Sequence, residues 1–213
     1  MLNWISQNWL EIFGALAGVV YVFLEIRQNL WLWPVGIVTS AVYIVVFLSG
    51  RLYADMTLQG YYLVISFAGL YWWVRGKGKD SAAGEGEGHA GSGTKGQGEG
   101  SEPLEVTRLR IKTGLILAGV LTGLFVLIWM VLDTMTDSPV PVWDSFITSV
   151  SVVATWMLAR KIYEHWYLWI IVNAVAVALF VSRGLYPTAG LYMVYFIMSF
   201  VGLKTWSGSL KKD

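Results

Sequence analysis

The stretch WYLWIIVN, residues 166–173, decides the fold because a related stretch, WPVGIVTS, stands 133 positions earlier at residues 33–40. Both stretches begin with a tryptophan, Trp33 and Trp166, and both carry an isoleucine four positions later. Each lies inside a long apolar run. Internal repeats of this kind are common in membrane transporters. The pairing therefore predicts that the chain contains two copies of one structural unit.

The same shift of 133 positions aligns the flanking segments without gaps. It brings together residue types that hydropathy alone would not place in register: Arg27 and Arg160, Ser49 and Ser182, Tyr53 and Tyr186, Tyr62 and Tyr195, Ser66 and Ser199, Gly69 and Gly202, and Trp73 and Trp206. Each copy holds three apolar runs, and one further run lies between the copies. This pattern predicts a 3+1+3 parallel repeat about an axis along the membrane normal, an arrangement that places a substrate site between the halves.

Composition places the chain among helical membrane proteins. Of its 213 residues 56% are hydrophobic and only 14% are charged, whereas soluble domains have about 25% charged residues. Several apolar runs approach the roughly 20 residues that a helix needs to cross a bilayer. We predict an all-α integral membrane protein with seven transmembrane helices, at about 9–26, 31–49, 57–74, 112–132, 143–160, 166–182 and 187–206.

These spans define four segments. Residues 1–75 form the first three-helix repeat, and residues 111–135 form the central linking helix. Residues 136–213 form the second repeat and a tail. Between the first repeat and the central helix, residues 76–110 are rich in glycine, serine and charged residues, a composition typical of a flexible linker.

Charge placement predicts the orientation. Thirteen of the 15 lysines and arginines fall on one side of the predicted membrane, and only Arg51 and Arg183 fall on the other. By the positive-inside rule the basic side is cytoplasmic. The N-terminus then lies outside and the C-terminus inside, which requires an odd number of spans.

Within the opening stretch, Trp166, Trp169 and Asn173 lie at helical positions i, i+3 and i+7 and therefore share one stripe. Two indole faces and a carboxamide suit a flat, polar, heteroaromatic ligand, and indoles also attract cations. Purely structural roles for these residues stay open as well. Tryptophan near a helix end is often an interface anchor, and asparagine in a membrane helix often joins two helices.

An asymmetric ligand at a pseudo-twofold interface should break the symmetry of the repeats where it binds. The shift pairs Gly36 with Trp169, Ser40 with Asn173, and Gln59 with Tyr192. Gln59, Tyr62 and Ser66 share one helical face. The predicted substrate-binding residues are therefore Trp166, Trp169, Asn173, Gln59, Tyr62, Ser66, Trp33, Ser40, Tyr192 and Tyr195. For Tyr62 and Tyr195, ordinary core packing is an equal alternative.

Other polar and aromatic residues are expected to have structural roles. We expect Glu25 to pair with Arg27 at the surface, His165 to be a solvated turn residue, and Trp73 and Trp206 to belong to an aromatic belt. No lysine or arginine lies deep in a span, which argues against a phosphorylated ligand. The absence of buried carboxylates argues against ion coupling.

Nothing in the sequence supports a catalytic site, a cofactor site or nucleic-acid binding. The chain has two histidines, no cysteine and a net charge of +1. It has no metal-ligand cluster, nucleophile elbow or phosphate loop. We predict that the protein is not an enzyme and binds neither metal, cofactor nor nucleic acid. The sequence does not determine the oligomeric state, and a homo-oligomer is one of the alternatives.

The motif Trp166-x-x-Trp169-x-x-x-Asn173, preceded by Pro141-Val142-Trp143-Asp144-Ser145, resembles the PnuC family of bacterial vitamin transporters. The resemblance covers all of the chain except the linker. It implies a SWEET-like seven-helix carrier in the bacterial cytoplasmic (inner) membrane. It also implies facilitated diffusion of nicotinamide riboside, trapped afterwards by cytoplasmic phosphorylation. In the family the tryptophans and asparagine of the motif surround the substrate with a glutamine that here is Gln59.

Two alternatives remain. Relatives that carry nicotinamide riboside tend to read Tyr-Gly-Trp near the end of the third helix, where this chain reads Ala68-Gly69-Leu70. Thiamine, another flat cationic vitamin, is therefore the alternative substrate. In a different class, the chain could be a membrane interaction subunit that docks through its linker.

Overall fold

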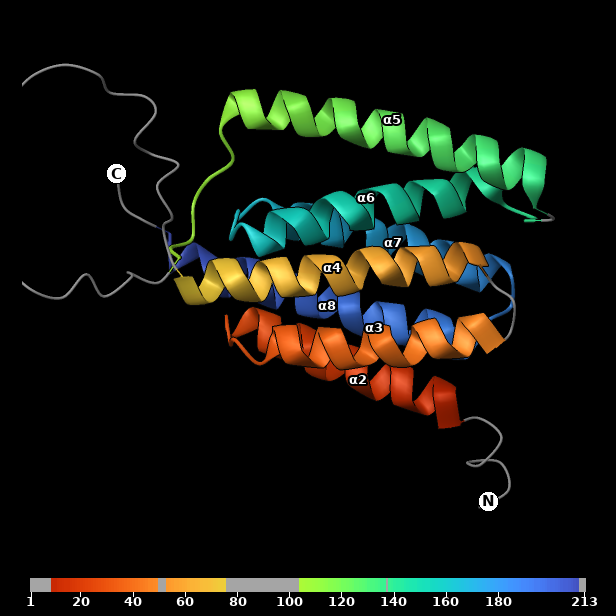
Figure 1. Cartoon of the computed structure of the whole chain (residues 1–213), viewed down its shortest axis with the longest axis horizontal. Coiled ribbons are helices and arrows are strands. Elements are labelled where there is room, and N and C mark those ends of the chain that lie inside the picture. Colours follow the sequence, from red (N-terminus) through yellow and green to blue (C-terminus); the bar gives the residue numbers. More distant parts are fainter. Residues whose placement is uncertain (1–8, 50–52, 76–103, 137, 211–213) are drawn as a thin grey trace, which may run out of the picture.

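The computed structural model describes residues 9–49, 53–75, 104–136 and 138–210, and within them the fold is all-helical. Seven helices follow one another, named as in Figure 1: α2 (Trp9–Ile26), α3 (Leu32–Ser49), α4 (Tyr53–Arg75), α5 (Ile111–Met135), α6 (Pro141–Ala159), α7 (His165–Ser182) and α8 (Tyr186–Ser207). The predicted seven helices are thus present in the described part of the chain. The linker prediction for residues 76–102 lies outside the described residues.

Length and composition suit several of these helices to a bilayer. Four of them, α5, α6, α7 and α8, are long and apolar enough to cross a membrane, and the described parts of α2 and α3 contain shorter apolar helices. Helix α5 has no buried residue. A helix that is apolar all round and unburied within the protein is suited to contact lipid.

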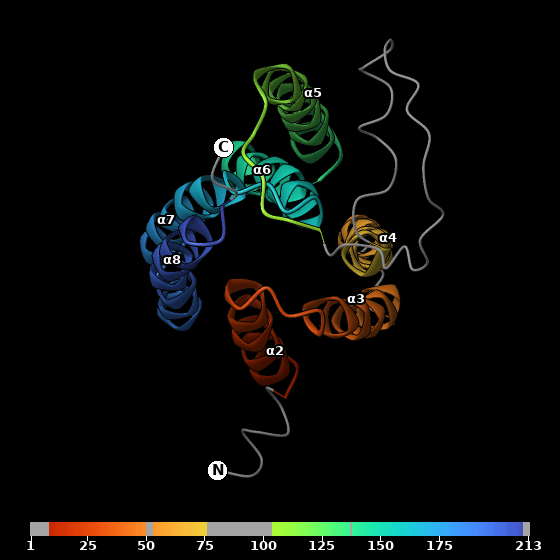
Figure 2. The ribbon, with the colours of Figure 1, turned by 90° about the vertical axis from the view of Figure 1, so that its left-hand side faces the viewer.

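Six helices form a closed ring. Helix α2 packs against α3, α3 against α4, α4 against α6, α6 against α7, α7 against α8, and α8 against α2. Figure 2 looks along this ring and shows α5 outside it, beside α6. The interior of the ring is therefore bounded by all described helices except α5.

The helices of the two predicted units have matching bounds and matching contacts. Helix α7 begins and ends 133 positions after α3. Trp33 packs against the backbone of Gly69, and Trp166 packs in the same way against Gly202, with no room for a Cβ atom at either glycine. These glycines therefore let an indole lie directly on the neighbouring helix.

The turns after α2 and α6 also match. Gln28 and Lys161, which are 133 positions apart, are the two described non-glycine residues with positive φ, at 52° and 50°. Left-handed residues of this kind commonly end helices.

One end of the ring is filled by four buried tryptophans, which we call the tryptophan plug: Trp33, Trp73, Trp166 and Trp206. The Trp33–Trp73 ring centroids are 5.4 Å apart, those of Trp166–Trp206 are 5.8 Å apart, and those of Trp73–Trp206 are 6.5 Å apart. The expectation that Trp73 and Trp206 form an aromatic belt is therefore wrong, because both indoles pack inside the protein.

The plug lies where α4 ends and where residues 104–110 return to the bundle, and we call this the linker end. Val106 is buried in the same cluster as the plug. Thr107 accepts a hydrogen bond from Tyr163 and donates one to the Lys161 carbonyl, at 2.9 and 3.0 Å. Residues 104–110, which fall within the predicted linker, are thus packed against the turn between α6 and α7. Burial also lowers the pKa of Lys161.

Candidate functional site

A cavity of about 320 Å³ occupies the interior of the ring. Its walls come from α2, α3, α4, α6, α7 and α8, so every helix of the ring contributes and α5 does not. Pockets of roughly 300 Å³ or more commonly hold small organic ligands. The cavity stops at the linker end, where Glu25 and Trp166 belong to its lining but Trp33, Trp73 and Trp206 do not.

Nine of the ten predicted site residues line this cavity: Trp166, Trp169, Asn173, Gln59, Tyr62, Ser66, Ser40, Tyr192 and Tyr195. The exception is Trp33, which is fully buried in the plug. All six residues of the symmetry-breaking pairs, Gly36 and Ser40 among them, also face the cavity. The structure therefore brings the predicted set together, and whether these residues bind a substrate stays a prediction.

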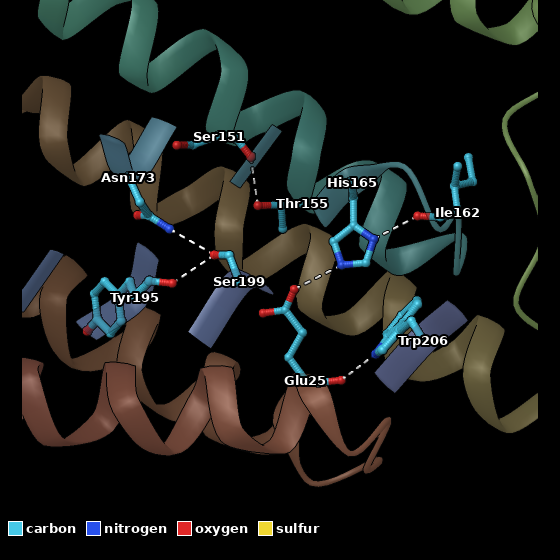
Figure 3. Close-up of polar contacts among 9 residues, drawn as sticks. All are labelled: Glu25, Ser151, Thr155, Ile162, His165, Asn173, Tyr195, Ser199 and Trp206. Atoms are coloured by element: carbon cyan, nitrogen blue, oxygen red, sulfur yellow. Dashed lines mark hydrogen bonds and ion pairs between the residues drawn. The ribbon is translucent and has the colours of Figure 1, made fainter. Parts of the chain in front are cut away.

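Serine and asparagine hydrogen bonds fix the polar side of the wall. Asn173 Nδ2 donates to Ser199 Oγ over 3.2 Å, and Ser199 Oγ donates to the Tyr195 carbonyl over 2.8 Å (Figure 3). In the other unit Ser66 Oγ donates to the Tyr62 carbonyl over 2.7 Å. Both serines are therefore held by their own helices, and Asn173 adds a link from α7 to α8.

Two indole N–H groups in the lining lack a partner within the described residues. Trp166 Nε1 and Trp169 Nε1 are both buried and make no hydrogen bond there. A buried donor without an acceptor costs about 1–3 kcal/mol. An acceptor on a bound ligand would remove that cost, so these groups favour a ligand that carries carbonyl or hydroxyl oxygens.

Glu25 and His165 contradict both expectations made for them. Glu25 does not pair with Arg27 at the surface, because its side chain is buried and Arg27 instead lies over the Phe23 ring. His165 is not solvated, since it is 0% exposed. Its Nε2 lies 3.1 Å from Glu25 Oε1, and its Nδ1 lies 2.7 Å from the Ile162 carbonyl oxygen. The hydropathy of the sequence did not predict this buried pair, because both residues lie at helix ends.

The charge of the lining is simple. Among the described residues that line the cavity, Glu25 is the one with a carboxyl group, and none is lysine or arginine. The expectation of a cavity without a buried carboxylate is therefore wrong. No group of three or more metal-ligating side chains occurs in the part of the chain that the structure describes. This lining suits a neutral or cationic ligand better than an anion.

The walls supplied by α2 and α6 were not predicted. Gly14 and Gly18 line the cavity, and a Cβ atom on either would overlap a tyrosine hydroxyl, that of Tyr43 or Tyr195. The signal for the glycines was present as GALAG, two glycines four residues apart, which permits close approach in membrane helices. From α6, Ser151 and Thr155 face the cavity, and Thr155 Oγ1 donates to the Ser151 carbonyl over 2.8 Å.

A family model described as "Nicotinamide mononucleotide transporter" matches residues 8–208. The chain belongs to this family. The resemblance to PnuC transporters seen in the sequence is thereby confirmed. Together with the apolar helices, membership in this family makes the chain a multi-pass membrane protein.

Relatives within and near the family carry different vitamins. The "Nicotinamide riboside transporter PnuC" of Escherichia coli (strain K12) is 24% identical over 213 residues, covering 96% of this chain and 87% of the relative. The "Riboflavin/roseoflavin transporter RibM" of Streptomyces davaonensis is 23% identical over 228 residues, covering 100% of this chain and 95% of the relative.

A solved structure shares the fold. The "Crystal structure of the Vitamin B3 transporter PnuC" superimposes with a TM-score of 0.67 at 20% identity, and the match covers 95% of this chain and 82% of that one. At this identity the likeness establishes the fold alone. The all-α fold predicted from the apolar runs is therefore confirmed.

Proposed function

We propose that this protein carries nicotinamide riboside across the bacterial inner membrane by facilitated diffusion, with the ring cavity as its binding site. The observation that carries the proposal is the lining itself. Its described residues combine aromatic side chains, an asparagine and one carboxylate, Glu25, with no lysine or arginine. Relatives that are named as nicotinamide riboside transporters support the choice of substrate.

The chemistry of the substrate matches this lining. Nicotinamide riboside has a pyridinium ring with a positive charge, a carboxamide and a ribose. Indole faces attract cations, and a carboxylate nearby adds to that attraction. In the proposal Trp166 and Trp169 contact the ring and donate from Nε1, while Asn173 and Gln59 bind the carboxamide or ribose. Tyr62, Tyr192, Tyr195, Ser40 and Ser66 complete the wall. Trp33 supports the site from within the plug.

A phosphorylated substrate fits less well, although the family description names the mononucleotide. A phosphate in a site of low dielectric needs a basic partner. No described residue of the lining offers one. Phosphorylation in the cytoplasm would accordingly produce a molecule that cannot return through the cavity, which traps the vitamin inside the cell.

The architecture we propose is the 3+1+3 parallel repeat. Matching bounds of α3 and α7, together with matching indole-on-glycine contacts, support a twofold relation between the two triplets. Helix α5 would restore the direction of the chain, so that both triplets cross the membrane in the same sense. The positive-inside rule then puts the N-terminus outside and the linker end at the cytoplasm.

The decisive experiment is a binding titration of purified protein with nicotinamide riboside, its 5′-phosphate, thiamine and riboflavin. We expect the riboside to bind and the phosphate to bind at least about tenfold more weakly, since burial of one unpaired charge costs more than about 1.4 kcal/mol. Tight binding of the phosphate would refute the proposed substrate. Liposomes that contain the protein should then equilibrate labelled riboside without an ion gradient.

Thiamine and riboflavin are the competing substrates. Thiamine is also a cationic ring, so Glu25 and the indoles would suit it, and it remains the alternative. Riboflavin is favoured by the relative named RibM, but its ring system carries no positive charge for Glu25 to attract. If riboflavin binds more tightly than the riboside in the same titration, the substrate is a flavin.

A further inference from the structure

The contact between Glu25 and His165 joins two helices, α2 and α7, that are not neighbours in the ring and have α8 between them. Glu25 lies near the end of α2, whose neighbours in the ring are α3 and α8, and His165 begins α7, whose neighbours are α6 and α8. The described parts of α2 and α7 do not pack against each other. Their side chains nevertheless meet at 3.1 Å with exposed fractions of 3% and 0%, so the pair spans the interior between the cavity and the plug.

Hydrogen bonds hold both members of the pair. His165 Nδ1 lies 2.7 Å from the Ile162 carbonyl, which can only accept, so Nδ1 carries a hydrogen. The contact between Nε2 and Glu25 Oε1 then requires one further proton, shared by the two groups. Trp206 Nε1 donates to the Glu25 carbonyl over 3.1 Å. The end of α2 is thus fastened to α7 and α8 (Figure 3).

The equivalent pair of positions in the repeat carries no polar group. A shift of 133 positions pairs Glu25 with Leu158 and Leu32 with His165. Leu32 and Leu158 are both 0% exposed and lie in the same buried cluster as the plug. One pair of equivalent positions is therefore apolar, and the other holds a hydrogen-bonded pair of ionisable groups. Because Glu25 also lines the cavity, the polar contact is the one that a solute in the cavity can reach.

We propose that Glu25 and His165 form the latch that keeps the linker end of the cavity closed. The proposal rests on the proposed transport function, because a solute can leave towards the linker end only if this end opens. Opening separates α2 from α7, breaks the shared hydrogen bond and lets the tryptophan plug part. His165 thereby positions Glu25 at the closed end until a solute arrives there.

The absence of cysteine from the chain allows a direct test. Ala159, which is 0% exposed and belongs to the plug cluster, is replaced in Ala159→Cys as a reporter of plug opening. Ala154, equally buried on the same helix but outside both hydrophobic clusters, is replaced in Ala154→Cys as a matched control for general loosening. The full chain is reconstituted in lipid nanodiscs, and the rate of thiol alkylation is measured without substrate.

With the native pair, we expect slow alkylation at both positions. His165→Ala should accelerate alkylation at position 159 by about tenfold or more, the factor expected when a hydrogen bond to a charged group is lost. Alkylation at position 154 should stay slow. Glu25→Ala tests the same contact from the other side, should His165→Ala fail to fold.

A double replacement, Glu25→Leu with His165→Leu, copies the leucine pair found at the equivalent positions, Leu158 and Leu32. Apolar residues can replace a buried pair without loss of stability, so alkylation at position 159 should return to the slow rate. Equal rates in the native and single-variant backgrounds would overturn the latch. Equal acceleration at positions 154 and 159 would also overturn it. Neither result depends on the identity of the substrate, which is tested separately by the binding titration.

Discussion

Asn173 Nδ2 and Ser199 Oγ are 3.2 Å apart, and this hydrogen bond joins α7 to α8 in the wall of the cavity. Ser199 in turn donates to the Tyr195 carbonyl on its own helix. The asparagine is therefore held in one orientation before any ligand arrives. Held in this way, an amide loses little conformational freedom when it binds a ligand.

Asn173→Ala should weaken binding of nicotinamide riboside by about tenfold, because one hydrogen bond within a protected site is worth about 1 kcal/mol or somewhat more. Isothermal titration calorimetry of the purified variant measures the effect. Ser182→Ala is the control on the same helix, since Ser182 Oγ donates to the Leu179 carbonyl and lies outside the cavity lining. Unchanged binding in Asn173→Ala would remove this residue from the site.

Trp169→Phe separates stacking from hydrogen bonding. Phenylalanine keeps an aromatic face but removes the N–H group, which is buried and lacks a partner among the described residues. We expect binding to weaken by several-fold, and Trp169→Ala to weaken it further by loss of the aromatic contact, worth about 0.5–2 kcal/mol. The same titration measures both variants. If Trp169→Phe binds as tightly as the native protein, the indole acts through its face alone.

Glu25→Gln should change which ligands bind rather than whether the cavity forms. Glutamine can keep a hydrogen bond to His165 but has no charge. Affinity for cationic nicotinamide riboside should fall by about tenfold at most, because His165, which shares a proton with Glu25, offsets part of a Coulomb attraction worth about 1–4 kcal/mol at 4 Å. Affinity for the uncharged reduced riboside should change little. An equal loss for both ligands would show that Glu25 acts on the shape of the cavity and not on charge.

Gly202→Ala should destabilise the protein, because its new methyl group would overlap the Trp166 indole. Overpacking of this kind costs about 1–3 kcal/mol. Gly69→Ala should do the same through Trp33. Gly190→Ala is the matched control on α8, where a Cβ atom meets nothing within 4 Å. Thermal unfolding in detergent should show a lower midpoint for the first two variants only.

The sequence predicted the parts of the fold that depend on apolar length. The helices begin and end within a few residues of the predicted spans, because each apolar run must match the same membrane thickness. The predicted cavity residues came from comparison of equivalent positions, such as Ser40 with Asn173. Nine of the ten line one cavity because all six helices of the ring enclose it, and their role in binding stays a prediction.

The sequence failed where a helix end is buried. Glu25 and His165 look like surface residues, since each stands beside a turn with charged neighbours. Their contact joins residues 140 positions apart, and neither lies on the stripe that the tryptophans define. The expectation of an aromatic belt at Trp73 and Trp206 failed for the same reason, because an indole near a helix end can face either lipid headgroups or a packed core. Only the closure of the ring decides between these environments.

Among the described helices, α5 packs only against α6, and none of its residues is buried in the protein. No side chain of α5 reaches the cavity or the tryptophan plug. The structure therefore constrains α5 through its hydropathy, its length and its packing against α6, and not through the cavity. We expect that another apolar helix of the same length could replace α5. Because every residue that lines the cavity belongs to the other six helices, a protein assembled from two separately produced triplets would keep all of them.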